Sequence, residues 1–364
     1  MRIALLGAGH IGQTIARLLG ATGDFEVTVV DRSADALARL RGDPAKTLRI
    51  ETADPGALRD VLRGQDAVIN ALPYHLATLA ATQALAAGCH YFDLTEDVAA
   101  TQSIMKLAEG AATAFMPQCG LAPGFIGIVA HHLARSFDSV IEVKMRVGAL
   151  PAFPTNALKY NLTWSVDGLI NEYCHPCEAI REGKLIEALP LEGMEHFSLD
   201  GTEYEAFNTS GGLGTLCDTW AGRVQTLDYK SVRYPGHRQL MKFLLEELQL
   251  NKDTETLKEI MRKSIPSTMQ DVVLVFVTVS GQRGGALVQE VFARKIFADR
   301  SETAPLSAIQ ITTAAGICAA VDLFREGALP QRGFIRQEQV ALPSFLTNRF
   351  GAAYQQSRQV ESIG

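Results

Sequence analysis

Apolar runs alternate with amphipathic stretches along the first third of the chain. The runs at 2–6, 25–30 and 67–71 carry aliphatic side chains with few polar breaks, which is typical of strands buried on both faces. The repeated strand–helix order predicts a parallel sheet with helices on both sides. We expect strands at 2–6, 25–30, 48–51, 67–71, 91–94 and 113–116, and helices at 13–19, 34–41, 57–62 and 76–87.

The pattern changes beyond residue 119. Residues 141–147 alternate apolar with charged side chains, which predicts a strand with one solvent-facing side, as in antiparallel sheets. We expect further strands at 271–279 and 289–297, and a helix of small residues at 308–324 that packs back onto the first part. These features predict an α/β chain with a first domain over 1–122, completed by 305–345, and a second, α+β domain over 123–304 with an antiparallel sheet.

Three glycines directly follow the first expected strand. Gly7, Gly9 and Gly12 form the pattern G-x-G-x-x-G, which permits a tight turn, the approach of a pyrophosphate and close helix–strand packing. Asp31 ends the next strand, where a carboxylate accepts hydrogen bonds from the adenosine ribose and repels a 2′-phosphate. The pattern predicts a Rossmann domain that prefers NAD over NADP, although the adjacent Arg32 offers a cation that weakens this preference. The alternative is a glycine-rich turn in another kind of α/β domain.

Further cofactor contacts are expected where other strands end at the same edge of the sheet. Asp54 is placed to meet the adenine, and the segment from Asn70 to Pro73 to lie beside the ribose and nicotinamide. Gly124 opens a helix whose backbone N–H groups face the nicotinamide. The full set of expected contacts is Gly7, Gly9, His10, Ile11, Gly12, Asp31, Arg32, Asp54, Asn70, Ala71, Leu72, Pro73 and Gly124.

Two candidate substrate contacts lie in the same region. Tyr74 continues the loop after the fourth strand, and a half-buried packing aromatic explains it equally well. Asp93 begins an acidic stretch, D-L-T-E-D, after the fifth strand. A carboxylate there binds a substrate amine or, alternatively, caps a helix.

The densest polar group of the second domain is the stretch from Tyr229 to His237. Strand alternation places Tyr229, Ser231 and Arg233 on one side and Lys230 on the other. An arginine fork is the natural partner of a substrate carboxylate, and the alternative is a surface strand with two solvated cations. Upstream, Ser210 lies in a turn rich in hydrogen-bond donors.

Composition removes several other classes of function. The 34 basic and 40 acidic residues give a net charge of −6, so nothing favours a nucleic acid or an anionic membrane as partner. No run of 18 apolar residues is present to span a membrane. Six scattered cysteines indicate reduced thiols in a cytoplasmic protein, and the lone pair Cys174 and Cys177 lacks the second C-x-x-C of a zinc site. We therefore expect no metal.

Several stretches resemble the saccharopine dehydrogenase-like family, and within it the L-lysine 6-dehydrogenases. They are the glycine motif, VINALPYHLA at 68–77, HYFDL at 90–94, GLAPGF at 120–125, EAFNTSGG at 205–212 and LDYKSVRYPGH at 227–237. The resemblance implies a Rossmann domain followed by an α+β mixed-sheet domain that binds the substrate and forms a homodimer. It also implies NAD as cofactor and oxidative deamination of L-lysine at its side-chain amine.

Site residues follow from the same resemblance. It implies a pocket walled by Trp164, with Tyr229, Ser231, Arg233 and His237 around the substrate. His237 is the first candidate general base and Lys230 the second. Two departures affect the substrate: Trp164 and Glu172 stand where the related lysine enzymes carry phenylalanine and histidine. The alternatives are a saccharopine dehydrogenase, whose larger substrate needs another arginine, and a dinucleotide-binding protein without catalysis.

Overall fold

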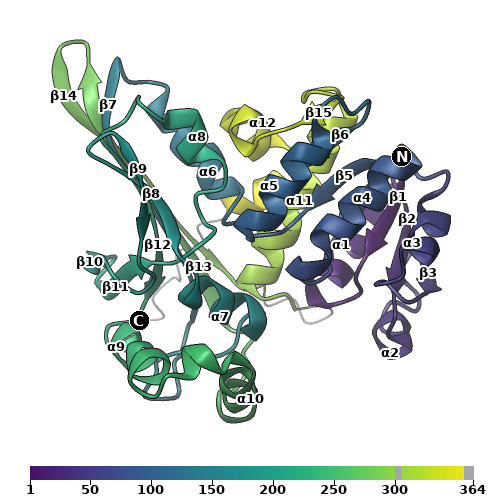
Figure 1. Ribbon diagram of the computed structural model, residues 1–364, viewed down its shortest axis with the longest axis horizontal. Helices are drawn as coiled ribbons and strands as arrows, with labels where there is room; N and C mark the ends of the chain where they lie inside the picture. The colour runs from purple at the N-terminus through teal and green to yellow at the C-terminus, as the bar shows by residue number, and fades with distance from the viewer. Residues whose placement is uncertain (300–304, 356–364) are drawn as a thin grey trace, which may run out of the picture. The chain divides into compact units, whose positions relative to one another are not determined.

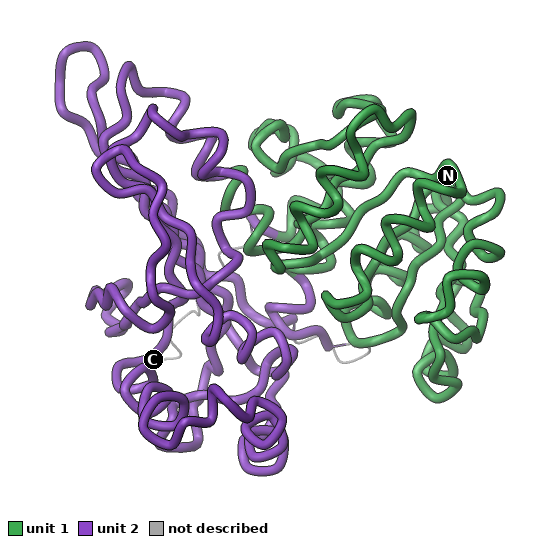
Figure 2. The backbone as a smooth tube through the Cα atoms, viewed as in Figure 1, with its two compact units in different colours: residues 1–128, 312–353 green, residues 129–311, 354–364 purple. Residues whose placement is uncertain are grey.

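The computed structural model describes residues 1–299 and 305–355, which form two compact units. Unit 1 comprises Met1–Ile128 and Thr312–Ala353, and the described part of unit 2 comprises 129–299, 305–311 and 354–355 (Figure 2). Each unit is built around its own sheet, as the change in hydrophobic pattern near residue 119 predicts.

Unit 1 contains a seven-stranded parallel sheet in the order β15-β6-β5-β4-β1-β2-β3. Its strands are β1 Arg2–Leu6, β2 Glu26–Asp31, β3 Lys46–Arg49, β4 Ala67–Asn70, β5 His90–Asp93, β6 Ala114–Met116 and β15 Gly333–Phe334. The strand order reverses between β1 and β4, and Leu6 is in register with both Val30 and Asn70. The carboxyl ends of these three strands therefore meet at the point where open α/β sheets bind ligands.

Helices alternate with β1 to β6 along the chain (Figure 1). They are α1 His10–Gly20, α2 Ala34–Ala38, α3 Pro55–Leu62, α4 Ala77–Ala87, α5 Val98–Ala108, α6 Phe125–Ala134, α11 Ala308–Arg325 and α12 Leu342–Thr347, with short turns η1 Tyr74–Leu76, η4 Gln337–Gln339 and η5 Gly351–Gln355. Helices α6 and α11 each cross the boundary between the two units. Alanines of α4 pack against buried strand residues such as Val68 and Tyr91, so small side chains let helix and sheet approach closely.

Unit 2 contains an eight-stranded mixed sheet with a path β10-β11-β12-β7-β13-β14, extended by β8 and β9. Its strands are β7 Ser139–Pro151, β8 Cys177–Arg181, β9 Lys184–Ala188, β10 Glu195–Leu199, β11 Thr202–Asn208, β12 Thr226–Arg233, β13 Asp271–Arg283 and β14 Ala286–Phe297. Only β12 and β7 pair in parallel within it. Its helices are α7 Val166–Cys174, α8 Leu216–Trp220, α9 His237–Lys242, the π-helix η2 Phe243–Glu247, the turn η3 Leu250–Lys252 and α10 Thr254–Ser264.

The expected strands are present, with shifted ends. The third strand is Lys46–Arg49 rather than 48–51, and the helix expected at 34–41 ends at Ala38. β7 and β13 run beyond the expected ranges because they pair with each other along almost their whole lengths, from Asp271 with Pro151 to Gln282 with Ser139. Helices α5, α7, α8, α9, α10 and α12 were not predicted.

One helix in the described part of the chain, α11, is long and apolar enough to cross a membrane. Its residues are 78% buried within the protein. A helix at the centre of a protein core passes the same test of length and hydropathy, so this finding is weak evidence for a membrane span.

Candidate functional site

The glycine loop of unit 1 owes its shape to three different constraints. Gly7 has φ +102°, and a Cβ there would lie 2.7 Å from the Ala71 carbonyl oxygen. A Cβ on Gly12 would overlap the Gly7 carbonyl oxygen. A Cβ on Gly9 would meet nothing within 4 Å. The first and third glycines therefore serve packing, while the second leaves open space above the loop.

Helix α1 begins at this open space. Its N-cap is Gly9, no side chain caps it, and its first turn carries no acidic residue. The first backbone N–H groups, at His10 and Ile11, are thus available to an anion at the positive end of the helix dipole. The loop and helix together fit the pyrophosphate of a dinucleotide.

Asp31 lies at the carboxyl end of β2, as predicted, and its carboxylate supports the loop. One oxygen accepts the Ala8 N–H at 2.7 Å, and the other accepts the Ser33 N–H at 2.7 Å. Each oxygen keeps a second lone pair, which a ribose hydroxyl can use. The neighbouring Arg32 is exposed, so a cation stands beside the acidic group.

Asp54 and Asn70 have local partners that the sequence did not reveal. Asp54 is the N-cap of α3 and accepts the Gly56 N–H at 2.7 Å. Asn70 is buried, donates to the Tyr91 hydroxyl at 3.1 Å, and accepts the Leu72 N–H at 3.2 Å. Asn70 therefore fixes the loop that continues through Ala71, Leu72 and Pro73 at the edge of the sheet.

The structure argues against Asp93 as a partner of a substrate amine. It is fully buried, and its oxygens accept hydrogen bonds from the Tyr91 hydroxyl and from the Thr95 and Gln118 N–H groups. Burial raises its pKa to about 6, although these hydrogen bonds oppose the rise. Asp93 thus organises the turns that follow β5 and β6.

Three other residues at this edge have distinct settings. Gly124 has φ +131°, and a Cβ there would lie 2.8 Å from the Gln118 carbonyl oxygen, so packing alone requires glycine. Tyr74 starts η1 and is half-buried, which leaves both of its expected roles open. Burial raises the pKa of Glu96 to about 7, helped by the charges of Asp97 and Asp93. Glu96 belongs to the acidic stretch predicted to follow the fifth strand, where Asp93 was named as the candidate contact.

In unit 2, Arg233 is the centre of a buried cluster. Its side chain lies on β12, is 3% exposed, and places its guanidinium 5.3 Å from the ring centre of Tyr160 and 5.8 Å from that of Tyr173. Its Nε donates to the Tyr173 hydroxyl at 2.9 Å, and its Nη1 donates to the Val232 carbonyl. The alternative of a solvated surface strand is therefore wrong.

His237 completes this hydrogen-bonded chain. Its Nδ1 lies 3.0 Å from the Leu158 carbonyl oxygen, which can only accept, so Nδ1 carries the proton and Nε2 accepts from the Tyr173 hydroxyl at 3.0 Å. Burial, reinforced by the charge of Arg233, lowers its pKa to about 3. The occupied lone pair and the low pKa argue against the expected role of general base. His237 instead positions Tyr173.

The same face of the sheet collects most of the other predicted substrate contacts. Ser231 shares a 2.8 Å hydrogen bond with Thr209, and the Ser210 N–H donates to the Glu172 carbonyl at 3.1 Å. The Tyr229 ring fills the space beside Gly212. The Trp164 ring packs in the same way on Gly168, within the apolar cluster that also contains Tyr160 and Tyr173. The fold thus brings together Trp164, Glu172, Ser210, Tyr229, Ser231 and Arg233.

Lys230 lies on the opposite face of β12, as strand alternation predicts. Its ammonium pairs with Glu195, which also pairs with Arg146, and Asp228 lies 3.9 Å away. This buried network separates Lys230 from the cluster around Arg233, which argues against its expected role as second candidate base.

The cysteine pair does not form part of a metal-binding group among the described residues. No cluster of three or more His, Cys, Asp or Glu side chains that could hold a metal is found there. Burial raises the pKa of Cys174, and raises that of Cys177 to about 12, so both thiols are protonated near neutral pH.

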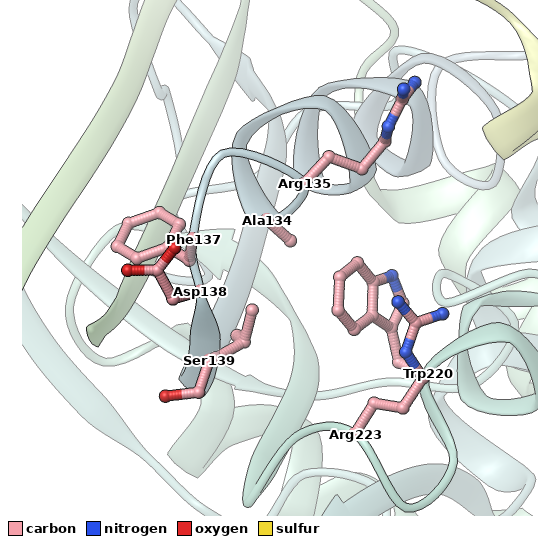
Figure 3. Close-up of a pocket in the computed structure, with 8 residues that line it drawn as sticks. Ala134, Arg135, Phe137, Asp138, Ser139, Trp220 and Arg223 are labelled. Atoms are coloured by element: carbon pink, nitrogen blue, oxygen red, sulfur yellow. The ribbon is translucent and has the colours of Figure 1, made fainter. Parts of the chain in front are cut away.

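A separate hollow of about 460 Å³ lies on unit 2, where α6 ends, β7 begins and α8 ends. Figure 3 shows Phe137, Asp138 and Ser139 on one side of it and Trp220 with Arg223 on the other. The Arg223 guanidinium lies 4.8 Å from the Trp220 ring centre. None of the predicted site residues lines this hollow.

Two family models together match nearly the whole chain. The saccharopine dehydrogenase NADP binding domain matches residues 3–115, and the saccharopine dehydrogenase C-terminal domain matches residues 120–350. The chain belongs to the saccharopine dehydrogenase family. The resemblance drawn from the sequence motifs is confirmed, as is the predicted fold of a Rossmann-like domain with a second mixed-sheet domain.

Distant relatives match at low identity. Saccharopine dehydrogenase [NADP(+), L-glutamate-forming] of Saccharomyces cerevisiae is 24% identical over 265 residues, which are 69% of this chain and 59% of the relative. The mitochondrial alpha-aminoadipic semialdehyde synthase of Bos taurus is 21% identical over 317 residues, which are 83% of this chain and 34% of the relative. The chain thus spans about a third to three fifths of the length of these relatives.

Two solved structures share the fold. Apo saccharopine dehydrogenase (L-Glu forming) from Saccharomyces cerevisiae has a TM-score of 0.78 at 17% identity and covers 96% of this chain and 98% of that one. Homospermidine synthase from Legionella pneumophila, in complex with NAD, has a TM-score of 0.65 at 15% identity, with 97% and 89% covered. At these identities the likeness shows the fold alone.

Proposed function

We propose that this chain is an NAD-dependent dehydrogenase that deaminates L-lysine oxidatively at its side-chain amine, as an L-lysine 6-dehydrogenase does. The observation that carries the proposal is the buried Arg233, whose guanidinium lies near the rings of Tyr160 and Tyr173 and within electrostatic reach of Glu172 on α7. A guanidinium and a carboxylate in one buried cluster suit the two charges of an amino acid.

In this proposal each residue of the cluster binds or orients. Arg233 binds the α-carboxylate, while Tyr173 and His237 hold its guanidinium in place through their hydrogen bonds. Glu172, Ser210 and Ser231 offer polar contacts to the rest of the substrate. Trp164 and Tyr229 form apolar walls that exclude water.

The glycine loop and the N-terminus of α1 would hold the pyrophosphate of the dinucleotide. When bound, the nicotinamide supplies the hydride acceptor. The carbon that bears the neutral side-chain amine would give a hydride to this acceptor and become an iminium ion, and water would hydrolyse the iminium to an aldehyde and ammonium. The protein contributes mainly position and orientation.

NAD as the preferred cofactor rests on Asp31, whose charge opposes a 2′-phosphate. The match to the NADP binding domain of the family and the exposed Arg32 favour NADP, so we propose NAD as the preferred cofactor and not as the exclusive one. We also propose a homodimer and a cytoplasmic location. The six free cysteines, five of them buried, are consistent with that location.

A saccharopine dehydrogenase is the second candidate, favoured by the match of both family models. Its substrate carries more carboxylates than lysine, so it needs another cation near Arg233. Two other arginines of unit 2 are engaged elsewhere. Arg146 pairs with Glu195 on the face of the sheet that carries Lys230, and Arg223 lies over the Trp220 ring at the separate hollow. This arrangement supports the smaller substrate. A dinucleotide-binding protein without catalysis is the third candidate.

A panel of amino acids, diamines and saccharopine, assayed with NAD and with NADP for formation of the reduced nicotinamide, tests the proposal. We expect L-lysine with NAD to give the highest kcat/KM. Turnover of saccharopine in preference to lysine would support the second candidate, and no turnover of any amine would support the third. Equal kcat/KM with both cofactors would contradict the role assigned to Asp31.

A further inference from the structure

Strand β14 ends the sheet path of unit 2 with an open edge. It is twelve residues long, pairs with β13 on one side, and has no partner on its other side among the described residues. Figure 1 shows β14 in the long hairpin at the margin of this sheet. A long edge strand exposes a row of backbone N–H and C=O groups that can pair with another chain.

Two aliphatic side chains of this edge strand are exposed to solvent. Leu287 is 69% exposed and Val291 is 52% exposed. Natural edge strands are usually short, kinked or rich in inward-pointing charges, which prevents such pairing. β14 lacks proline, and it continues in regular register with β13 from Ala286 to Phe297.

The charges of β14 are arranged for pairing with a second copy of itself. In an antiparallel pair with a two-fold axis at Phe292, each Glu290 faces Arg294 of the other copy, and the contact occurs twice. An axis at Glu290 would instead place two glutamates opposite each other. Axes at Val291 or Ala293 would leave both charges opposite apolar side chains. We consider only registers whose two-fold axis passes through a residue. In these registers the side chains that face each other across the pair lie on the same face of the sheet.

Within one copy of the chain, Glu290 and Arg294 contact residues of their own hairpin. Glu290 pairs with Arg283 at 2.6 Å, and the two side chains remain 37% and 40% exposed. The Arg294 guanidinium lies over the Phe292 ring, 4.8 Å from its centre. Both charged groups belong to the same strand face, so a partner strand meets them together.

We infer that β14 is a homodimer interface, in which two copies of the chain join edge to edge around Phe292 into one continuous sheet. The inference rests on the proposed homodimer and is independent of the proposed activity. It assigns the contact surface and its register.

Charge reversal on the full chain tests this surface. Sedimentation velocity over a range of concentrations should show a dimer for the native protein. Glu290→Arg and Arg294→Glu each place like charges opposite each other twice, which should raise the dissociation constant on the order of tenfold or more. The double variant Glu290→Arg with Arg294→Glu should restore it to about the native value. Arg181→Glu, an exposed reversal on β8, is the matched control and should change nothing.

Cysteine cross-linking provides the second readout, which also serves if a reversal variant fails to fold. On mild oxidation, Phe292→Cys should give a disulfide-linked dimer, because the residue faces its own copy, and Leu287→Cys should not. The native chain, oxidised in the same way, serves as the control for cross-links formed by its own six cysteines. A dimer that is insensitive to both reversals, or that is linked by neither cysteine, would overturn this interface and leave the homodimer standing. A native monomer would overturn both.

Discussion

Units 1 and 2 present their candidate binding groups in opposite ways. In unit 1 the groups are backbone N–H donors at the start of α1, exposed because Gly9 carries no side chain. In unit 2 they are side chains, such as Arg233 and Tyr173, buried from water and fixed by one another. The first arrangement needs only local geometry, and the second needs several elements to meet. Substitutions in unit 1 should therefore be able to change binding without changing stability, whereas substitutions in the cluster of unit 2 should change both.

The largest effect is expected within the glycine loop, where substitution of Gly12 should affect stability and substitution of Gly9 should affect dinucleotide binding. Gly12→Val places atoms on the Gly7 carbonyl oxygen and should lower the free energy of unfolding by about 3 kcal/mol or more. Gly9→Ala meets open space at φ −67° and should leave stability within about 1 kcal/mol. It should nevertheless weaken dinucleotide binding at least tenfold, about 1.4 kcal/mol, because the methyl group occupies the approach of the phosphates.

Urea unfolding and calorimetric titration measure these two properties. Equal losses of stability in Gly9→Ala and Gly12→Val would contradict the division of roles, as would dinucleotide binding that Gly9→Ala leaves unchanged.

The next effect belongs to the buried cluster and depends on pH. The pKa of His237 is about 3 in the folded chain, below the value of 6.5 expected when unfolded. Between these two pH values the unfolded chain therefore binds more protons at His237 than the folded chain does. The contribution of the neutral His237 to the free energy of unfolding is complete above pH 6.5 and is lost as the pH falls toward 3. A difference of one bound proton changes the free energy of unfolding by about 1.4 kcal/mol per pH unit.

His237→Phe keeps a ring against Phe207 and removes the titration. Its free energy of unfolding should lie below that of the native chain at pH 7, and the gap should narrow as the pH is lowered to 5. Other buried groups, such as Asp93, titrate in both proteins and cancel in the difference. A gap that stays constant with pH would show that His237 does not titrate as described.

The smallest effect concerns Asp54, which was predicted to contact the adenine and which caps α3 in the structure. Asp54→Ala should cost about 1 kcal/mol of stability, the usual value for a lost N-cap. Dinucleotide affinity should change less than twofold if capping is its main role. A tenfold loss of affinity without loss of stability would restore the original prediction.

Features that depend on a few consecutive residues could be predicted from the sequence. The glycine loop and the end of β2 are set by a few consecutive residues, so the motif was sufficient to locate Gly7, Gly12 and Asp31. The grouping of Tyr229, Ser231 and Arg233 followed from strand alternation alone. Both were accessible because each depends on one element.

The environment of single side chains was not accessible in this way. Asp93 is surrounded by groups from β5 and from the turn after β6, and His237 meets residues of α7 and of the loop before Tyr160. Their hydrogen bonds, and hence their pKa values, arise from contacts between distant parts of the chain. Tyr173, which connects Arg233 with His237, gave no signal beyond its place beside Glu172.

The central claim is that Arg233 binds the carboxylate of an amino-acid substrate. The most direct test compares kcat/KM for L-lysine and for 1,5-diaminopentane, which lacks only the carboxylate, in the native chain, Arg233→Lys and Arg233→Ala. We expect the native chain to prefer lysine strongly, and Arg233→Ala to lose roughly 10- to 1000-fold with lysine, about 1.4 kcal/mol per tenfold. Arg233→Lys keeps the charge without the fork and should be intermediate. The diamine should be a poor substrate in all three proteins, with unchanged NAD affinity. Equal losses with lysine and the diamine would show that Arg233 is structural and contradict the account.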